Sequence, residues 1–281
     1  MGAAVTIVDA HHHVWDLSVR DQDWITGPEL QPLRRNFSVD DLAPDAEAAG
    51  VGRTVLVQTV TVAEETPEFL ALAAEHKLIA GVVGWTDLTR PDVAEELARL
   101  RELPGGRYLK GIRHQVQGEP DPQWLLRADV RRGLAAVADA GLVYDLVVLP
   151  HQLPACAEAA AGLPELTFVL DHLGKPPIAS GSREPWASDL RALAALPNTV
   201  CKLSGMVTEA DPASWTPDDL RPYADVVLDA FGPDRSMFGS DWPVCTLAAS
   251  YEQVLAVAQE LTAPAERTQI FETTATRVYD L

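Results

Sequence analysis

The order of apolar and amphipathic segments along the chain limits its fold more than any other sequence feature. Short segments rich in branched apolar residues alternate with segments of helical period. Strands that are apolar on both faces and joined by helices are typical of a parallel sheet covered by helices. Eight strands are predicted, at residues 5–9, 54–58, 80–85, 108–113, 142–148, 166–171, 199–204 and 236–241.

The segments between these strands have the chemistry of crossover helices. Val93, Leu97 and Leu100 recur at helical spacing, and Thr216 before Pro217 is typical of a helix start. A closed (β/α)8 barrel of the TIM type takes about 250 residues. We therefore predict a single α/β barrel domain over residues 1–281. An open doubly wound sheet is the alternative, but its Gly-x-Gly-x-x-Gly signature does not follow the first strand.

The charge of the chain indicates which partners it avoids. Its formal net charge is −19 at pH 7, so we expect neither nucleic acid nor an anionic membrane as a partner. The first residues show no basic segment followed by an apolar stretch, and no run of about 18 apolar residues occurs. The expected protein is soluble and cytoplasmic and acts on a small molecule. The sequence leaves open whether it forms a homo-oligomer.

Histidines gather where the predicted strands end. In a (β/α)8 barrel the chemistry takes place at the carboxyl ends of the strands. Only His76 among the seven histidines falls at the end of a helix, and His151 follows the fifth strand. The other five lie at strand ends: His11, His12, His13, His114 and His172. This distribution predicts a catalytic site.

Residues two apart on an extended segment point to the same side, so His11 and His13 can converge while His12 points away. Asp241 ends the eighth predicted strand. Cations such as Arg113 and Lys175 suit the polar groups of an anionic substrate. Trp15 and Trp242 follow strand ends and suit pocket walls, although packing in the core is the more common role of a tryptophan.

Several segments together resemble one known family. DAHHHVWD, GIRHQVQGEPDP, LDHLGKPP, CKLSGMVTEAD and FGSDWPVC are similar, in this order, to the amidohydrolase superfamily, and more narrowly to its lactonase branch. The resemblance spans nearly the whole chain. It implies a (β/α)8 barrel that opens a lactone ring, with a sugar lactone such as L-fucono- or L-rhamnonolactone preferred over a pyrone dicarboxylate.

The resemblance also implies metal ligands, which are His11, His13, His172 and Asp241. Two departures argue against a two-metal centre. Lys110 lies inside the fourth strand rather than at its end, and His151 comes only after the fifth strand. We therefore expect at most one divalent ion, zinc. Catalysis without a metal is an equal alternative, because lactones are activated esters.

The predicted reaction begins when Asp241 takes a proton from water, which then attacks the lactone carbonyl. His172 and His114 complete the predicted catalytic set, with His114 donating a hydrogen bond to the developing oxyanion. The predicted substrate-binding residues are Arg113, His151, Lys175, Trp15, Gln115 and Trp242. Three alternatives remain: a metal-dependent decarboxylase, a pyrone-dicarboxylate lactonase, and an inactive barrel that binds a sugar acid.

Overall fold

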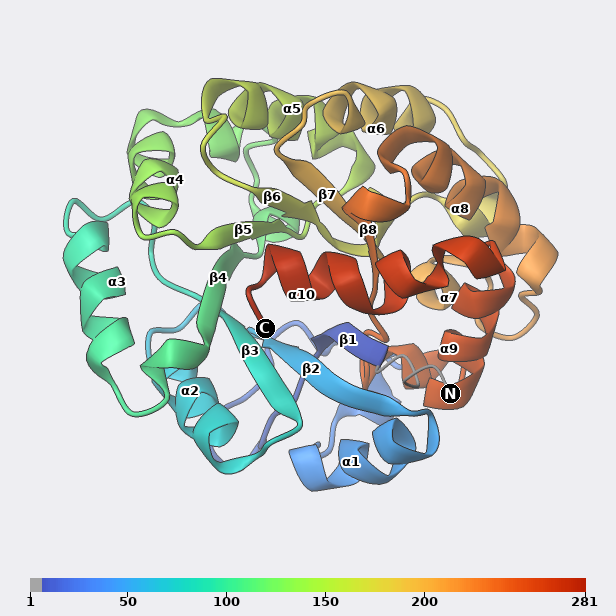
Figure 1. Ribbon diagram of the computed structural model, residues 1–281, viewed down its shortest axis with the longest axis horizontal. Coiled ribbons are helices and arrows are strands. Elements are labelled where there is room, and N and C mark those ends of the chain that lie inside the picture. The colour runs from blue at the N-terminus through green and yellow to red at the C-terminus, as the bar shows by residue number, and fades with distance from the viewer. Residues whose placement is uncertain (1–6) are drawn as a thin grey trace.

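Eight parallel strands surround a common axis in chain order (Figure 1), in the computed structural model, which describes residues 7–281. The predicted (β/α)8 barrel is confirmed, and each predicted strand overlaps an observed one. Residues 5 and 6 of the first prediction lie outside the described residues. The strands are β1 Ile7–His12, β2 Val51–Val57, β3 Ile79–Gly84, β4 Leu109–His114, β5 Val143–Leu146, β6 Phe168–Leu170, β7 Thr199–Leu203 and β8 Ser236–Phe238.

The ring closes between the end of β1 and the residues that follow β8. The backbone N–H of Asp241 donates to the carbonyl of His11 at 2.8 Å, and that of His13 donates to the carbonyl of Trp242 at 2.7 Å. These bonds place Asp241 beside His11 and His13 at the end of β1. The closure of the barrel therefore builds part of the predicted site.

Helices cover the outside of the barrel, except that the last of them covers one end. They are α1 Val39–Ala48, α2 Glu65–Glu75, α3 Val93–Glu102, α4 Ala128–Asp139, α5 Leu153–Gly162, α6 Trp186–Ala194, α7 Met206–Glu209, α8 Pro217–Phe231, α9 Tyr251–Glu260 and α10 Thr274–Val278. As predicted, Thr216 caps α8, and it forms a capping box with Asp219. Gly141 follows α4 with a φ of 64°, a conformation that glycine adopts at little cost.

The last helix, α10, crosses the end of the barrel at which the strands begin (Figure 1). Ala275 and Tyr279 pack against the small apolar side chains that fill the barrel below the site. Arg53, near the start of β2, donates to the hydroxyl of Thr276 at 2.9 Å. Because this end is closed, the barrel opens only where its strands end.

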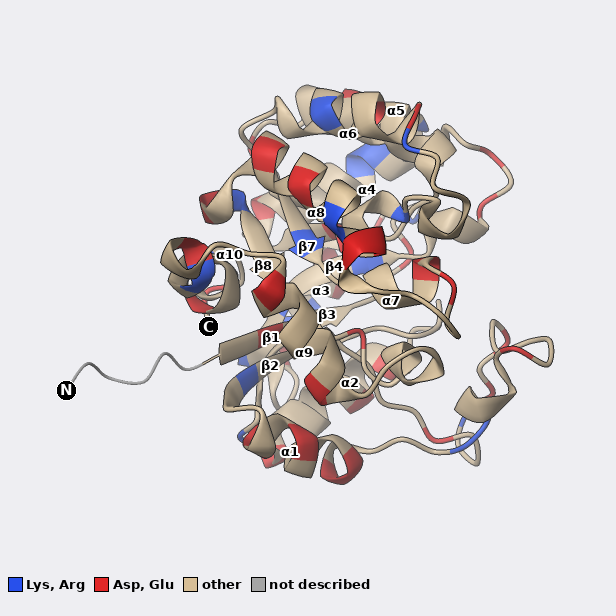
Figure 2. Cartoon of the chain, turned by 90° about the vertical axis from the view of Figure 1, so that its right-hand side faces the viewer, with Lys and Arg blue, Asp and Glu red and all other residues tan. Residues whose placement is uncertain are grey.

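The outer surface is predominantly acidic. Figure 2 shows Asp and Glu on outer helices that include α1, α8 and α9. Among residues 7–281, no helix is both long enough and apolar enough to cross a membrane. The three cysteines, Cys156, Cys201 and Cys245, are buried and form no disulfide.

Candidate active site

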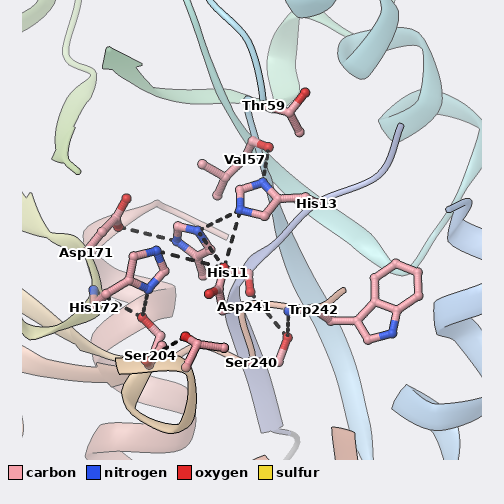
Figure 3. A network of polar contacts seen from close by, with 12 residues as sticks. His11, His13, Val57, Thr59, Asp171, His172, Ser204, Ser240, Asp241 and Trp242 are labelled. Carbon is pink, nitrogen blue, oxygen red and sulfur yellow. Dashed lines mark hydrogen bonds and ion pairs between the residues drawn. The ribbon is translucent and has the colours of Figure 1, made fainter. Parts of the chain in front are cut away.

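Four side chains from the ends of β1, β6 and β8 converge inside the open end of the barrel (Figure 3). We call His11, His13, His172 and Asp241 the histidine cluster. The Nε2 atoms of His11 and His13 lie 3.1 Å apart. Oδ1 of Asp241 lies 3.5 Å from Nε2 of His13, 3.8 Å from that of His11 and 3.9 Å from that of His172. The structure thus brings together all four predicted metal ligands.

The backbone at the ends of β6 and β8 takes an uncommon conformation to hold this cluster. His172 has a φ of 52° and Asp241 a φ of 58°, both in the left-handed region that side chains disfavour. Leu173 and Lys175 also have positive φ. Backbone strain of this kind concentrates at functional sites. The strain here supports a functional role for the two strand ends.

Burial keeps the imidazoles of His11 and His172 neutral. It lowers the pKa of His172 to about 4, although Asp241 and Asp171 oppose the shift, and it holds the pKa of His11 well below its ordinary value. Burial alone would raise the pKa of Asp241, but His172 and His13 outweigh it and keep that pKa below the ordinary value. The cluster therefore combines the ionised carboxylate of Asp241 with the neutral imidazoles of His11 and His172 near pH 7.

Each imidazole has a partner on the far side from Asp241. The Nδ1–H of His13 donates to the carbonyl of Val57 at 2.8 Å, and Nδ1 of His172 lies 2.8 Å from the Ser204 hydroxyl. Such outer contacts orient the ligands of metal ions in proteins. Ligand atoms of His11, His172 and Asp241 lie within 4.8 Å of one another, and all three side chains are buried. Imidazole nitrogens with a carboxylate oxygen form a donor set that suits zinc, so the residues fit one divalent ion.

Below the cluster, four charged side chains form a second buried set, which we call the salt-bridged layer: Arg113, Asp145, Asp171 and Lys202. Lys202 contacts Asp145 at 2.5 Å and Asp171 at 3.0 Å, and Arg113 donates to Asp171 at 2.9 Å. All four are at most 4% exposed. Because two cations face two anions, the formal charges of this layer balance.

A cavity lies next to the histidine cluster. Its lining residues are His13, Trp24, Thr59, Arg113, Gln115, Gln117, Val147, His172, Lys175, Asp241 and Val244. Three of the predicted substrate-binding residues, Arg113, Gln115 and Lys175, are among them. Gln115 is held by a hydrogen bond of 2.6 Å from its Nε2 to the Thr59 carbonyl, and Nζ of Lys175 lies 3.8 Å from Glu209.

The structure does not bring His114 to this cavity. Its Nδ1 accepts from the Trp85 indole at 3.0 Å, its Nε2 lies 2.7 Å from Glu119, and its ring stacks on Trp124. Successive residues of a strand point to opposite faces, so Arg113 points inward and His114 outward. Burial, opposed by Glu119, lowers the pKa of His114. Both ring nitrogens are thus engaged away from the cluster.

Three other predicted substrate-binding residues also lie outside the cavity. His151 is exposed in the short helix Pro150–Gln152. Trp15 and Trp242 are buried, and both rings pack against Phe37. Figure 3 shows the Trp242 side chain directed away from the histidine cluster. Apolar packing therefore decides where the two tryptophans lie.

Some residues of the site were not selected from the sequence. Thr59 follows β2 and Trp24 lies in the long segment between β1 and α1; both line the cavity. Asp9 is buried and accepts from the Ser240 backbone at 2.8 Å and from the Tyr251 hydroxyl at 3.0 Å. Thr59 could have been predicted, because it follows the carboxyl end of a barrel strand, where active-site residues lie. The other two depend on contacts between residues far apart in the sequence.

Comparison with known proteins decides the family. The amidohydrolase profile matches residues 8–281. The chain belongs to the amidohydrolase family. This amidohydrolase is similar to an L-fucono-1,5-lactonase of Burkholderia multivorans, with 42% identity over 98% of this chain and 96% of the relative. An L-fucono-1,5-lactonase of Burkholderia ambifaria is 40% identical over 87% of this chain and 82% of its own.

A solved structure extends the likeness to three dimensions. The crystal structure of an amidohydrolase from Burkholderia multivorans with bound zinc matches this amidohydrolase with a TM-score of 0.92 and 40% identity, over 98% of this chain and 99% of that chain. Together with the donor set of the histidine cluster, this supports the prediction of a divalent metal ion. Catalysis without a metal stays open as the second prediction.

Proposed function

We propose that this protein hydrolyses a sugar lactone and that L-fucono-1,5-lactone is its preferred substrate. The observation that carries the proposal is the convergence of three imidazoles and the Asp241 carboxylate beside a polar cavity. The printed activity of two relatives, at 42% and 40% identity, supports the choice of lactone.

In the proposed reaction, Asp241 acts as the general base. Its carboxylate is ionised, lines the cavity and is held by His13 and His172. It takes a proton from water, and the water oxygen forms a bond to the lactone carbonyl carbon. The bond between that carbon and the ring oxygen then breaks. The leaving alkoxide takes up the proton from Asp241, and an open hydroxy acid results.

The polar residues of the cavity would orient the substrate. Gln115 and Lys175 can contact hydroxyl groups of a sugar ring, and Arg113 lies where positive charge favours a developing oxyanion. Trp24 adds an apolar surface for the C–H face of the ring. A divalent ion held by His11, His13, His172 and Asp241 would supply Lewis-acid polarisation of the carbonyl.

The direct test is a lactonase assay with a pH indicator. L-fucono-1,5-lactone, L-rhamnonolactone and 2-pyrone-4,6-dicarboxylate are compared, and a blank without enzyme corrects for spontaneous opening. We expect turnover of the fuconolactone with the highest kcat/KM. Release of CO2 from an aromatic acid without lactone turnover would instead indicate a decarboxylase. Binding of sugar acids with no turnover of any substrate would indicate an inactive binding protein.

The metal requirement is tested separately. The purified protein is analysed for metal content, treated with a chelator and assayed again with and without added zinc. Loss of activity that zinc restores would assign a catalytic metal. Full activity at undetectable metal would leave the imidazoles as hydrogen-bonding groups.

A further inference from the structure

Lys202 is a fully buried ammonium whose place in the reaction has not been assigned. It lies on β7 inside the barrel, and its side chain is 0% exposed. A buried charge needs paired partners, and Asp145 at 2.5 Å and Asp171 at 3.0 Å supply them. The ammonium donates a hydrogen bond to Asp145, and Asp171 is an ion-pair partner.

The third direction of the ammonium leads to the histidine cluster. Nζ of Lys202 lies 3.1 Å from Nδ1 of His11. A lysine ammonium only donates hydrogen bonds, so Nδ1 makes a favourable contact only as an acceptor. Asp171, the competing partner for a proton on Nδ1, is more distant at 3.3 Å. The lysine contact therefore favours the form of His11 that carries its proton on Nε2.

The other side of the His11 ring agrees with this assignment. The Val57 carbonyl only accepts, so His13 carries its proton on Nδ1 and its Nε2 is an acceptor. This acceptor lies 3.1 Å from Nε2 of His11. One chain of donors then runs from Lys202 through His11 and His13 to Val57. Nη1 of Arg113 donates to Asp171 at 2.9 Å and also lies 3.4 Å from Nε2 of His11, a longer contact than the 3.1 Å from Lys202 to Nδ1, so the lysine contact decides the form of the ring.

A metal ion at Nε2 of His11 requires the opposite form. The lone pair must then be on Nε2, and the proton must be on Nδ1, where it faces the ammonium of Lys202. We propose that Lys202 is a positioning residue that holds His11 as a hydrogen-bond donor and thereby weakens metal binding. The proposal rests on the histidine cluster of the proposed function but not on its substrate.

The test compares zinc affinity in variants of the full chain. Lys202→Met alone would leave Asp145 unpaired, so Asp145→Asn is combined with it and the formal charge is unchanged. The matched control is Lys110→Met, because Lys110 on β4 donates to the Asp280 carbonyl at 2.6 Å instead. Zinc affinity is measured by competition with a chromophoric chelator. We expect binding at least tenfold tighter in the double variant and unchanged in the control and in Asp145→Asn alone.

A spectroscopic measurement reports the proton on His11 directly. In metal-free wild-type protein with ¹⁵N-labelled histidine, the His11 proton is expected on Nε2, and in the double variant on Nδ1. Equal or weaker zinc binding by a folded double variant would overturn the proposal. So would a wild-type His11 protonated on Nδ1, a result that is decisive even if the double variant fails to fold. Neither measurement depends on lactone turnover, so failure of the proposed function would leave the result intact.

Discussion

The salt-bridged layer and the histidine cluster, both buried inside the barrel, differ in how their polar groups are paired. In the salt-bridged layer, every cation contacts an anion, and the Tyr279 hydroxyl from α10 donates to Asp145 at 2.8 Å. In the histidine cluster, one carboxylate faces three imidazoles and a cavity. The charges of the layer are paired within the layer, whereas the cluster presents His13, His172 and Asp241 to a cavity in which a ligand can bind. The difference predicts that stability depends mainly on the layer and reactivity on the cluster.

The largest expected effect comes from removing the one charge of the cluster. Asp241→Asn should lower kcat by roughly 10²- to 10⁴-fold, because an amide cannot accept the proton from water. The free energy of unfolding should fall by no more than about 2 kcal/mol. Steady-state kinetics on the lactone and urea unfolding measure both quantities. Asp234→Asn, an exposed change before β8, is the control; near-normal turnover by Asp241→Asn would exclude Asp241 as the base.

The complementary change breaks the salt-bridged layer. Asp145→Ala leaves the Lys202 ammonium without its nearest anion, so the free energy of unfolding should fall by about 3–5 kcal/mol. Urea unfolding followed by circular dichroism measures the loss. Asp139→Ala, at the exposed end of α4, should change stability little. A loss below about 1 kcal/mol would show that the layer does not carry the stability assigned to it.

Glu65 offers an intermediate case, a buried carboxylate that contacts Thr59 and Val60 rather than a cation. Burial raises its pKa from 4.5 to about 7, against the hydrogen bonds from Thr59. The pKa of Glu65 is higher in the folded protein than in the unfolded chain. The protonated carboxyl therefore contributes fully to the stability of the fold below pH 4.5, and this contribution is lost as the pH rises through 7.

Glu65→Gln should remove this pH dependence. Relative to the variant, wild-type protein should lose up to about 3 kcal/mol of unfolding free energy between pH 4.5 and 8. Urea unfolding of both proteins across that range gives the difference. Parallel curves for the two proteins would show that Glu65 is ionised in the folded state.

The smallest effect is expected at His114, which the sequence analysis assigned to the oxyanion. His114→Gln keeps a donor and an acceptor near Trp85 and Glu119, outside the cavity. We expect kcat/KM to change by less than about tenfold and stability by about 1 kcal/mol. A fall of roughly 10²-fold or more would return His114 to the chemistry.

The fold was predictable because its signals are local. Each strand is a short apolar segment, and caps such as Thr216 mark helix starts within a few residues. The members of the histidine cluster were also predictable, since strand ends of a barrel must meet at one end. His11 and His13 were further distinguished from His12 by the alternation of a strand, and the ring of His12 makes no hydrogen bond to the cluster in the described residues.

The salt-bridged layer was not predictable in the same way. Asp145, Asp171 and Lys202 are separated by tens of residues, and a buried lysine contradicts the usual surface preference of that residue. Trp15 and Trp242 lie outside the cavity for a related reason, because their position depends on packing against Phe37. Long-range packing overrides the information that a strand end carries in the sequence.

The closure of the ring has a consequence for how the protein is made. Tyr279 donates a hydrogen bond to Asp145, and the end of β1 is joined to the far side of the ring by the residues that follow β8, among them Asp241 and Trp242. A chain emerging from the ribosome therefore holds an open ring, with the edge of β1 unpaired, until the residues after β8 have been made. Such edges are prone to aggregation during synthesis. For this protein, the speed of translation through β8 and the access of chaperones to the open ring should affect the yield of folded protein.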